Sequence, residues 1–140
     1  MRPARILREL DFARYYYYDR TGLYARSKRL GITSLQGATH VIILQPVPLF
    51  GSYKIETRLV YWDECSLFFR HELVTLADGC RRALLVSRQH SVGGTITDLL
   101  KDLPGTSFNR ICPIYIRKWL DAMLITGAKL RQLEYKQFEK

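Results

Sequence analysis

The sequence predicts an α+β fold in which one N-terminal helix packs against a long antiparallel sheet. Three features support this prediction: an apolar stripe at helical spacing near the start, long segments that alternate with a period of two, and turn-forming residues between them. With 140 residues, 47% of them hydrophobic, the chain has a common domain size and enough apolar side chains for a core. We therefore expect one domain over residues 1–140.

The first element expected is an amphipathic helix from Pro3 to about Gly22. Proline suits a first helical turn, where a missing N–H costs nothing, and glycine suits the stop. The apolar stripe consists of Ile6, Leu10, Ala13 and Tyr17, widened by Leu7 and Tyr18.

Strand patterning begins at Thr39 and continues for about fifty residues. Pro46 and Pro48 confine the first apolar stretch to an edge, a bulge or a strand end. Beyond them, Asp63-Glu64 and Asp78-Gly79 are turn signals that separate long alternating segments. These segments form a predicted three-strand meander: residues 52–62, 66–76 and 80–90.

Helical patterns return after the sheet. Gly93-Gly94 ends the strand pattern, and Asp98 to Leu103 fits a short helix. A C-terminal helix is expected from Pro113 to about Thr126, with Gly127 as its break.

Composition restricts the classes of function. No apolar run reaches the roughly 18–20 residues that a membrane-spanning helix needs. The net charge of +9 is densest before Gly31 and fits solvated faces, a cofactor phosphate or an acidic membrane surface. Nucleic-acid binding would rest on charge alone, because no RNA-binding or helix-turn-helix pattern is present, so it is not expected.

The cysteines and histidines do not have the spacing of a metal site. Cys65, Cys80 and Cys112 are widely separated, which favours free thiols in a reducing compartment. The three histidines lack HxH or HxxxH spacing, so no metal is expected.

The most specific motifs are RELDFAR in the helix, LFGSYKIETRLVYWD in the first long strand and LLVSRQH in the last. A helix followed by long twisted strands is the order of a hotdog fold, in which a sheet wraps round a central helix. From about Ala4 to Arg131 the chain resembles the hotdog-fold thioesterase superfamily, in particular the subgroup of its sixth member and the invertebrate relatives. The resemblance implies an acyl-CoA thioesterase-like protein of lipid metabolism, usually a homodimer whose sheets join edge to edge.

The same resemblance implies a difference from catalytic relatives. In those proteins an Asp and a His-x-Asn-Asn stretch precede the helix and place a carboxylate beside the thioester. Met1, Arg2 and Pro3 stand where that stretch would end, so we expect the standard carboxylate and the first strand to be missing. The chain is then either a shortened product or a member without that carboxylate. From this chain alone a cytoplasmic location is expected; a longer natural N-terminus would imply membrane association or the secretory pathway.

Thioester hydrolysis needs a base or nucleophile near the carbonyl carbon and hydrogen-bond donors for the developing oxyanion. Glu9 and Asp11 are the carboxylates of the first helical turns and the candidate catalytic residues. For Asp11 an ion pair with Arg8 or Arg14 is the alternative. No serine stands in a GxSxG context, so a covalent nucleophile is not expected.

Helix and strand residues are the candidates for binding the substrate. The expected acyl pocket is lined by Phe12, Tyr16, Tyr53, Ile55, Phe68 and Phe69, although these residues would equally make an ordinary core. The candidate neighbours of the CoA phosphates are Arg88, His90, Gly93 and Gly94. His71 and His90 are also read as half-buried packing residues.

The function predicted from the sequence is hydrolysis or binding of fatty acyl-CoA thioesters. No cofactor is expected apart from coenzyme A as part of the substrate. The alternative is a non-catalytic module that binds acyl-CoA or another lipid, or that serves in dimerisation.

Overall fold

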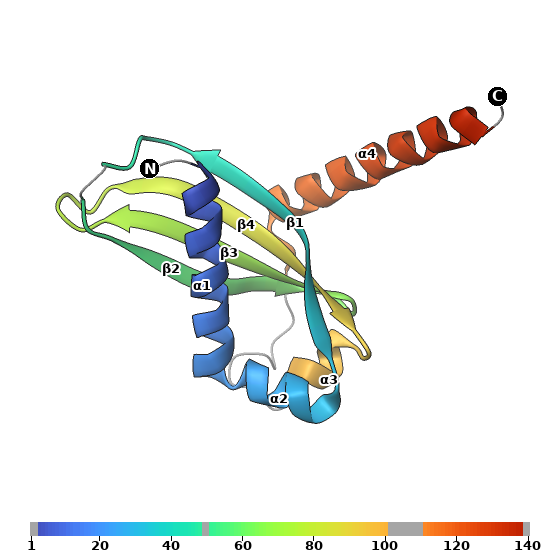
Figure 1. Ribbon diagram of the computed structural model, residues 1–140, viewed down its shortest axis with the longest axis horizontal. Coiled ribbons are helices and arrows are strands. Elements are labelled where there is room, and N and C mark those ends of the chain that lie inside the picture. The colour runs from blue at the N-terminus through green and yellow to red at the C-terminus, as the bar shows by residue number, and fades with distance from the viewer. Residues whose placement is uncertain (1–2, 49–50, 101–110, 139–140) are drawn as a thin grey trace. The chain divides into compact units, whose positions relative to one another are not determined.

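The computed structural model describes residues 3–48, 51–100 and 111–138 (Figure 1). Contacts within the chain define two compact units, Met1–Asn109 and Arg110–Lys140. The expectation of one domain over the whole chain stays a prediction.

A four-stranded antiparallel sheet dominates the first unit, with the order β1-β4-β3-β2. The predicted meander is confirmed by β2, β3 and β4, which pair in sequence. The remaining strand begins at Thr33, earlier than predicted from Thr39, and ends before the prolines. Its polar first half gives no strand signal by itself, but that half pairs with β4. The strands are β1 (Thr33–Ile43), β2 (Tyr53–Trp62), β3 (Ser66–Thr75) and β4 (Arg81–Val92).

Two helices precede the sheet where one was predicted. The first, α1 (Pro3–Thr21), stops before Gly22, which adopts a left-handed conformation with φ 80°. The chain then forms α2 (Leu23–Leu30), and Gly31 ends it with φ 69°. Glycine adopts this conformation without the steric cost of a Cβ atom, so the two glycines bound a separate short helix.

The helix α1 crosses one face of the sheet, which we call the inner face (Figure 1). Alternation along β3 directs Phe69, His71 and Leu73 to the inner face and Phe68 to the outer face. Tyr17 of α1 packs edge-on against Phe69, with 5.2 Å between the ring centroids. The predicted arrangement of helix and sheet is thus confirmed.

Two apolar clusters join α1 to the inner face. Burying one large apolar side chain contributes about 1.5–3 kcal/mol, so these clusters are the main source of stability at this interface. One contains Tyr18, Leu23, Ile32, Trp62, Leu67, Phe69, Ile96, Leu99 and Leu100. The other contains Ile6, Leu10, Val47, Leu73, Ala83 and Leu85.

The buried stripe of α1 is rotated slightly from the prediction. Ile6, Leu10 and Tyr18 are buried as expected, but Arg14 takes the place between them. Leu7, predicted to widen the stripe, is 38% exposed. Successive positions four apart therefore face the sheet, which brings one guanidinium to the interface.

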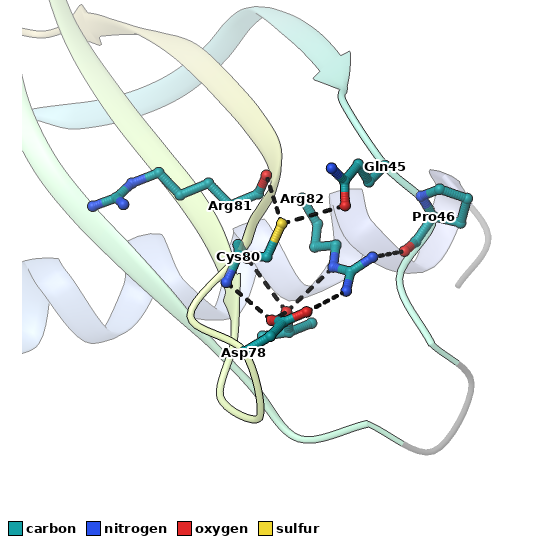
Figure 2. A network of polar contacts seen from close by, with 7 residues as sticks. Gln45, Pro46, Asp78, Cys80, Arg81 and Arg82 are labelled. Carbon is teal, nitrogen blue, oxygen red and sulfur yellow. Dashed lines mark hydrogen bonds and ion pairs between the residues drawn. The ribbon is translucent and has the colours of Figure 1, made fainter.

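The turn between β3 and β4 is fixed by a polar network (Figure 2). Arg82 donates to the Pro46 carbonyl oxygen (3.0 Å) and forms an ion pair with Asp78 (2.7 Å). These two contacts of Arg82 join the segment after β1 to the turn. Hydrogen bonds from Thr75 and from the Cys80 backbone N–H hold the pKa of Asp78 at about 2. The predicted Asp78-Gly79 turn is confirmed.

A short helix follows the sheet. It is α3 (Ile96–Leu100), which begins two residues before the predicted start at Asp98. Residues 101–103 of that prediction lie outside the described residues.

The second unit contains α4 (Ile114–Phe138). The predicted break at Gly127 is wrong, because the helix continues through it. One interior glycine costs about 1 kcal/mol relative to alanine, and the strong helix formers after it compensate for this cost. Within the described parts of the chain, no helix combines the length and apolar character needed to cross a membrane.

Candidate functional site

A pocket of about 430 Å³ lies between α1 and β2. This volume falls in the range of small-molecule sites, roughly 300–1,000 Å³. Two tyrosines and an isoleucine give it apolar walls, and one arginine and two threonines supply polar groups. Its lining residues are Ala13, Tyr16, Tyr17, Arg20, Thr21, Ile55 and Thr57.

A row of polar side chains crosses the inner face from this pocket into the core. Thr57 on β2 lies opposite His71 on β3, and its Oγ1 is 2.9 Å from His71 Nδ1. On the other side of the ring, His71 Nε2 is 3.2 Å from the Oγ of Ser87 on β4. Both ring nitrogens therefore have partners, as a buried imidazole requires.

His71 is held as a neutral imidazole. Its side chain is fully buried, and burial disfavours the charged form. The Arg14 guanidinium adds like-charge repulsion, and together these effects lower the pKa of His71 to about 3. At neutral pH the ring therefore has one donor nitrogen and one acceptor nitrogen.

Arg14 anchors the helix on the side away from the pocket. Its guanidinium pairs with Asp11 (3.2 Å) and donates to Gln36 Oε1 on β1 (2.7 Å). Gln36 in turn donates to Thr39. A buried charge with these partners positions α1 over β1, and it explains why an arginine is tolerated in the stripe.

The two candidate catalytic carboxylates lie on different flanks of α1, and neither lines the pocket. Asp11 forms the ion pair with Arg14 that was the predicted alternative. Glu9 faces Tyr53 at the start of β2, where burial and then the nearby Glu9 charge raise the pKa of the Tyr53 hydroxyl. The catalytic role assigned to them stays a prediction.

The structure brings together only part of the predicted acyl pocket. Tyr16 and Ile55 line the same cavity, but Phe12 is 59% exposed on the free side of α1. Phe68 and Phe69 point to opposite faces because side chains alternate along a strand. Phe69 belongs to the core beneath α1, so the two rings do not share one cavity, and their role in substrate binding stays a prediction.

The candidate phosphate neighbours lie elsewhere. Arg88 and His90 are on the outer face, where both contact the Ser66 hydroxyl (3.1 and 3.2 Å). A Cβ atom on Gly93 would meet the Gly31 carbonyl oxygen at 2.7 Å, and one on Gly94 would meet the Ile32 side chain. Close packing therefore explains why glycine occupies these two positions. The role of all four residues in binding the CoA phosphates stays a prediction.

Across residues 3–48, 51–100 and 111–138 there is no group of three or more His, Cys, Asp or Glu residues that could hold an ion.

Comparison with known proteins shows the family. Residues 1–114 match the model of the thioesterase-like superfamily, and the chain belongs to that superfamily. It is 38% identical to Protein THEM6 of Drosophila melanogaster over 132 residues, 94% of this chain and 68% of that protein. It is 34% identical to Protein THEM6 of Danio rerio over 103 residues, 74% of this chain and 51% of that protein. The chain thus spans about two thirds of the fly relative and half of the fish relative.

Solved structures confirm the hotdog fold. The probable thioesterase YbaW from Escherichia coli superposes with a TM-score of 0.62 at 15% identity, over 66% of this chain and 70% of YbaW. SAV2348 from Staphylococcus aureus, solved in complex with CoA, has a TM-score of 0.57 at 14% identity, over 81% and 84% of the two chains. At this identity the likeness concerns the fold.

Sequence reasoning missed Thr57, Arg14 and the full burial of His71. The alternation of β2 places Thr57 on the side of Tyr53 and Ile55, which was a usable signal. The contact between Thr57 and His71 depends on strand register, which the pattern does not supply.

Proposed function

We propose that this thioesterase-like protein binds fatty acyl-CoA thioesters, with the acyl chain in the pocket between α1 and β2. The observation that carries the proposal is the pocket itself: an apolar-walled cavity of about 430 Å³ between the central helix and the sheet. Membership of the thioesterase-like superfamily supports a thioester as ligand, and CoA bound to SAV2348 supports the carrier group.

The charge at the pocket agrees with such a ligand. Arg20 is exposed, and its guanidinium supplies the positive charge among the residues that line the pocket. A cation at the pocket favours the phosphates of CoA, while the aromatic walls accept the acyl chain.

Binding without turnover is the second candidate. The pocket lining contains no carboxylate, cysteine or histidine, and Asp11 is engaged by Arg14. If this chain does hydrolyse thioesters, Asp11 and Glu9 are the residues to test as catalytic. Release of free thiol from acyl-CoAs by the wild type, reduced in Asp11→Asn, would favour hydrolysis, whereas binding with no thiol release would favour a binding module.

The pocket assignment is tested by filling the cavity. Ala13 lines it, so Ala13→Phe should weaken binding of dodecanoyl-CoA at least tenfold and leave the weak binding of free CoA unchanged. Ala25→Phe, on the exposed surface of α2, is the matched control. Isothermal titration calorimetry gives both affinities, and melting curves check that each variant is folded. Equal dodecanoyl-CoA binding by a folded Ala13→Phe variant and the wild type would refute the pocket assignment.

The homodimer expected from the resemblance also belongs to this proposal. β1 and β2 are the outer strands of the described sheet. Their backbone groups are the ones with which a second copy would pair. Light scattering after size-exclusion chromatography would report the mass of a dimer or of a monomer.

A further inference from the structure

The polar row Thr57–His71–Ser87 is placed where an ordinary core would be apolar. It crosses the interface between α1 and the sheet, with Phe69 and Leu73 as neighbours of His71 along β3. Polar groups in such a place are costly unless every donor and acceptor is paired. The pairing of these three side chains therefore determines which hydrogen atom is left for a ligand.

The Ser87 hydroxyl determines which atoms donate and which accept the hydrogen bonds along this polar row. Its side chain is fully buried, and within the described residues its hydroxyl has one hydrogen-bond partner, His71 Nε2. If Nε2 carried the proton, the Ser87 hydrogen would have no acceptor, which costs about 1–3 kcal/mol. The satisfied arrangement has Ser87 donating to Nε2 and His71 carrying its proton on Nδ1.

These donor and acceptor roles also fix the role of Thr57, which lies at the pocket. In this tautomer Nδ1–H donates to Thr57 Oγ1 at 2.9 Å, so the threonine accepts from the ring. Its own hydroxyl hydrogen is then free to donate. Thr57 lines the pocket between α1 and β2, so this hydrogen is available to an acceptor in the cavity.

We propose that Thr57 donates a hydrogen bond to the carbonyl oxygen of an acyl thioester in this pocket, and that His71 is the positioning residue that orients the Thr57 hydroxyl. The inference rests on the function proposed above and adds the group that recognises the thioester. A hydroxyl held by a neutral, buried ring is already oriented, so binding loses little side-chain entropy. The same bond would polarise the carbonyl group if hydrolysis takes place.

The test compares ligands that differ in one oxygen atom. Dodecanoyl-CoA has the thioester carbonyl, and S-dodecyl-CoA replaces it with a methylene group. One hydrogen bond contributes a few-fold to tenfold in affinity, so wild-type protein should bind the thioester about three- to tenfold more tightly. Thr57→Val should lower thioester affinity to that of the thioether and leave thioether affinity unchanged. Thr57→Ser, which keeps the hydroxyl, should retain the preference. Dodecanoate is included to show whether a carboxylate satisfies the same donor.

The outcomes separate the two proposals. If wild-type protein binds neither CoA ligand, the proposed function fails and this inference with it. If it binds both equally, or if folded Thr57→Val keeps the preference, the carbonyl contact is refuted while acyl-CoA binding stands. Tighter binding of dodecanoate than of dodecanoyl-CoA would replace the thioester by a free carboxylate as the ligand.

The tautomer gives a readout without any ligand. Long-range ¹H–¹⁵N spectra of protein labelled in its histidines should show His71 at pH 7 as neutral with the proton on Nδ1. Ser87→Ala removes the donor to Nε2 and should shift the ring toward the other tautomer. A proton on Nε2 in the wild type would overturn the proposed orientation of Thr57.

Discussion

Acid should destabilise this fold through His71, and the size of the effect follows from its pKa. The folded-state pKa is about 3, against an ordinary value of 6.5. Below pH 6.5 the unfolded chain binds this proton and the folded protein does not, so stability falls as the pH falls. The contribution is fully present above pH 6.5 and is lost progressively toward pH 3. At pH 5.5 the loss from this group is about 1.4 kcal/mol.

The assay is urea denaturation at pH 7.5 and 5.5, followed by circular dichroism. His71→Gln removes the titrating ring and keeps groups that can contact Thr57 and Ser87. Its free energy of unfolding should fall between the two pH values by about 1.4 kcal/mol less than that of the wild type. His40→Gln on β1 removes an exposed imidazole and is the matched control. A His71→Gln variant with the full pH dependence of the wild type would refute the assignment of a neutral buried ring.

Three further changes probe the packing, each measured by thermal or urea unfolding. Phe69→Ala removes a fully buried ring that two tyrosines of α1 contact, and it should cost about 3–5 kcal/mol; a cost under 1 kcal/mol would contradict the packing of α1 on this face. Gly37→Ala places a Cβ atom against the His90 ring at the β1 bulge and should cost about 1–3 kcal/mol, so an unchanged midpoint would show that the ring lies elsewhere. Arg82→Met breaks the link to the Pro46 carbonyl and should cost about 1–2 kcal/mol; wild-type stability would count against the network at the β3–β4 turn.

The sheet was largely predictable from the sequence because period-two alternation is a local signal. The meander β2-β3-β4 follows from that alternation and from Asp78-Gly79. The start of β1 was not predictable from local pattern. Its polar residues adopt a strand conformation because they pair with β4. The prediction does not include α2, although Gly22 and Gly31 bound it, because the basic residues between them indicate charge more strongly than an apolar stripe.

The candidate site was less predictable than the fold. Tyr16 and Ile55 line one cavity because helical and strand periodicity put them on facing surfaces, and their role in substrate binding stays a prediction. Phe12 and Phe68 lie away from this cavity, because hydrophobicity indicates burial but does not indicate which face is buried. The row through His71 depends on register between three strands, which is a property of the folded sheet.

Crosslinking with a photoreactive ligand tests the central claim most directly. A fatty acyl-CoA with a diazirine near the end of its acyl chain is irradiated with the wild-type protein, and the labelled peptides are identified by mass spectrometry. We expect label in residues 12–21 of α1 and 53–59 of β2, reduced by excess dodecanoyl-CoA. Label confined to residues 114–138, or label that dodecanoyl-CoA does not reduce, would contradict that claim.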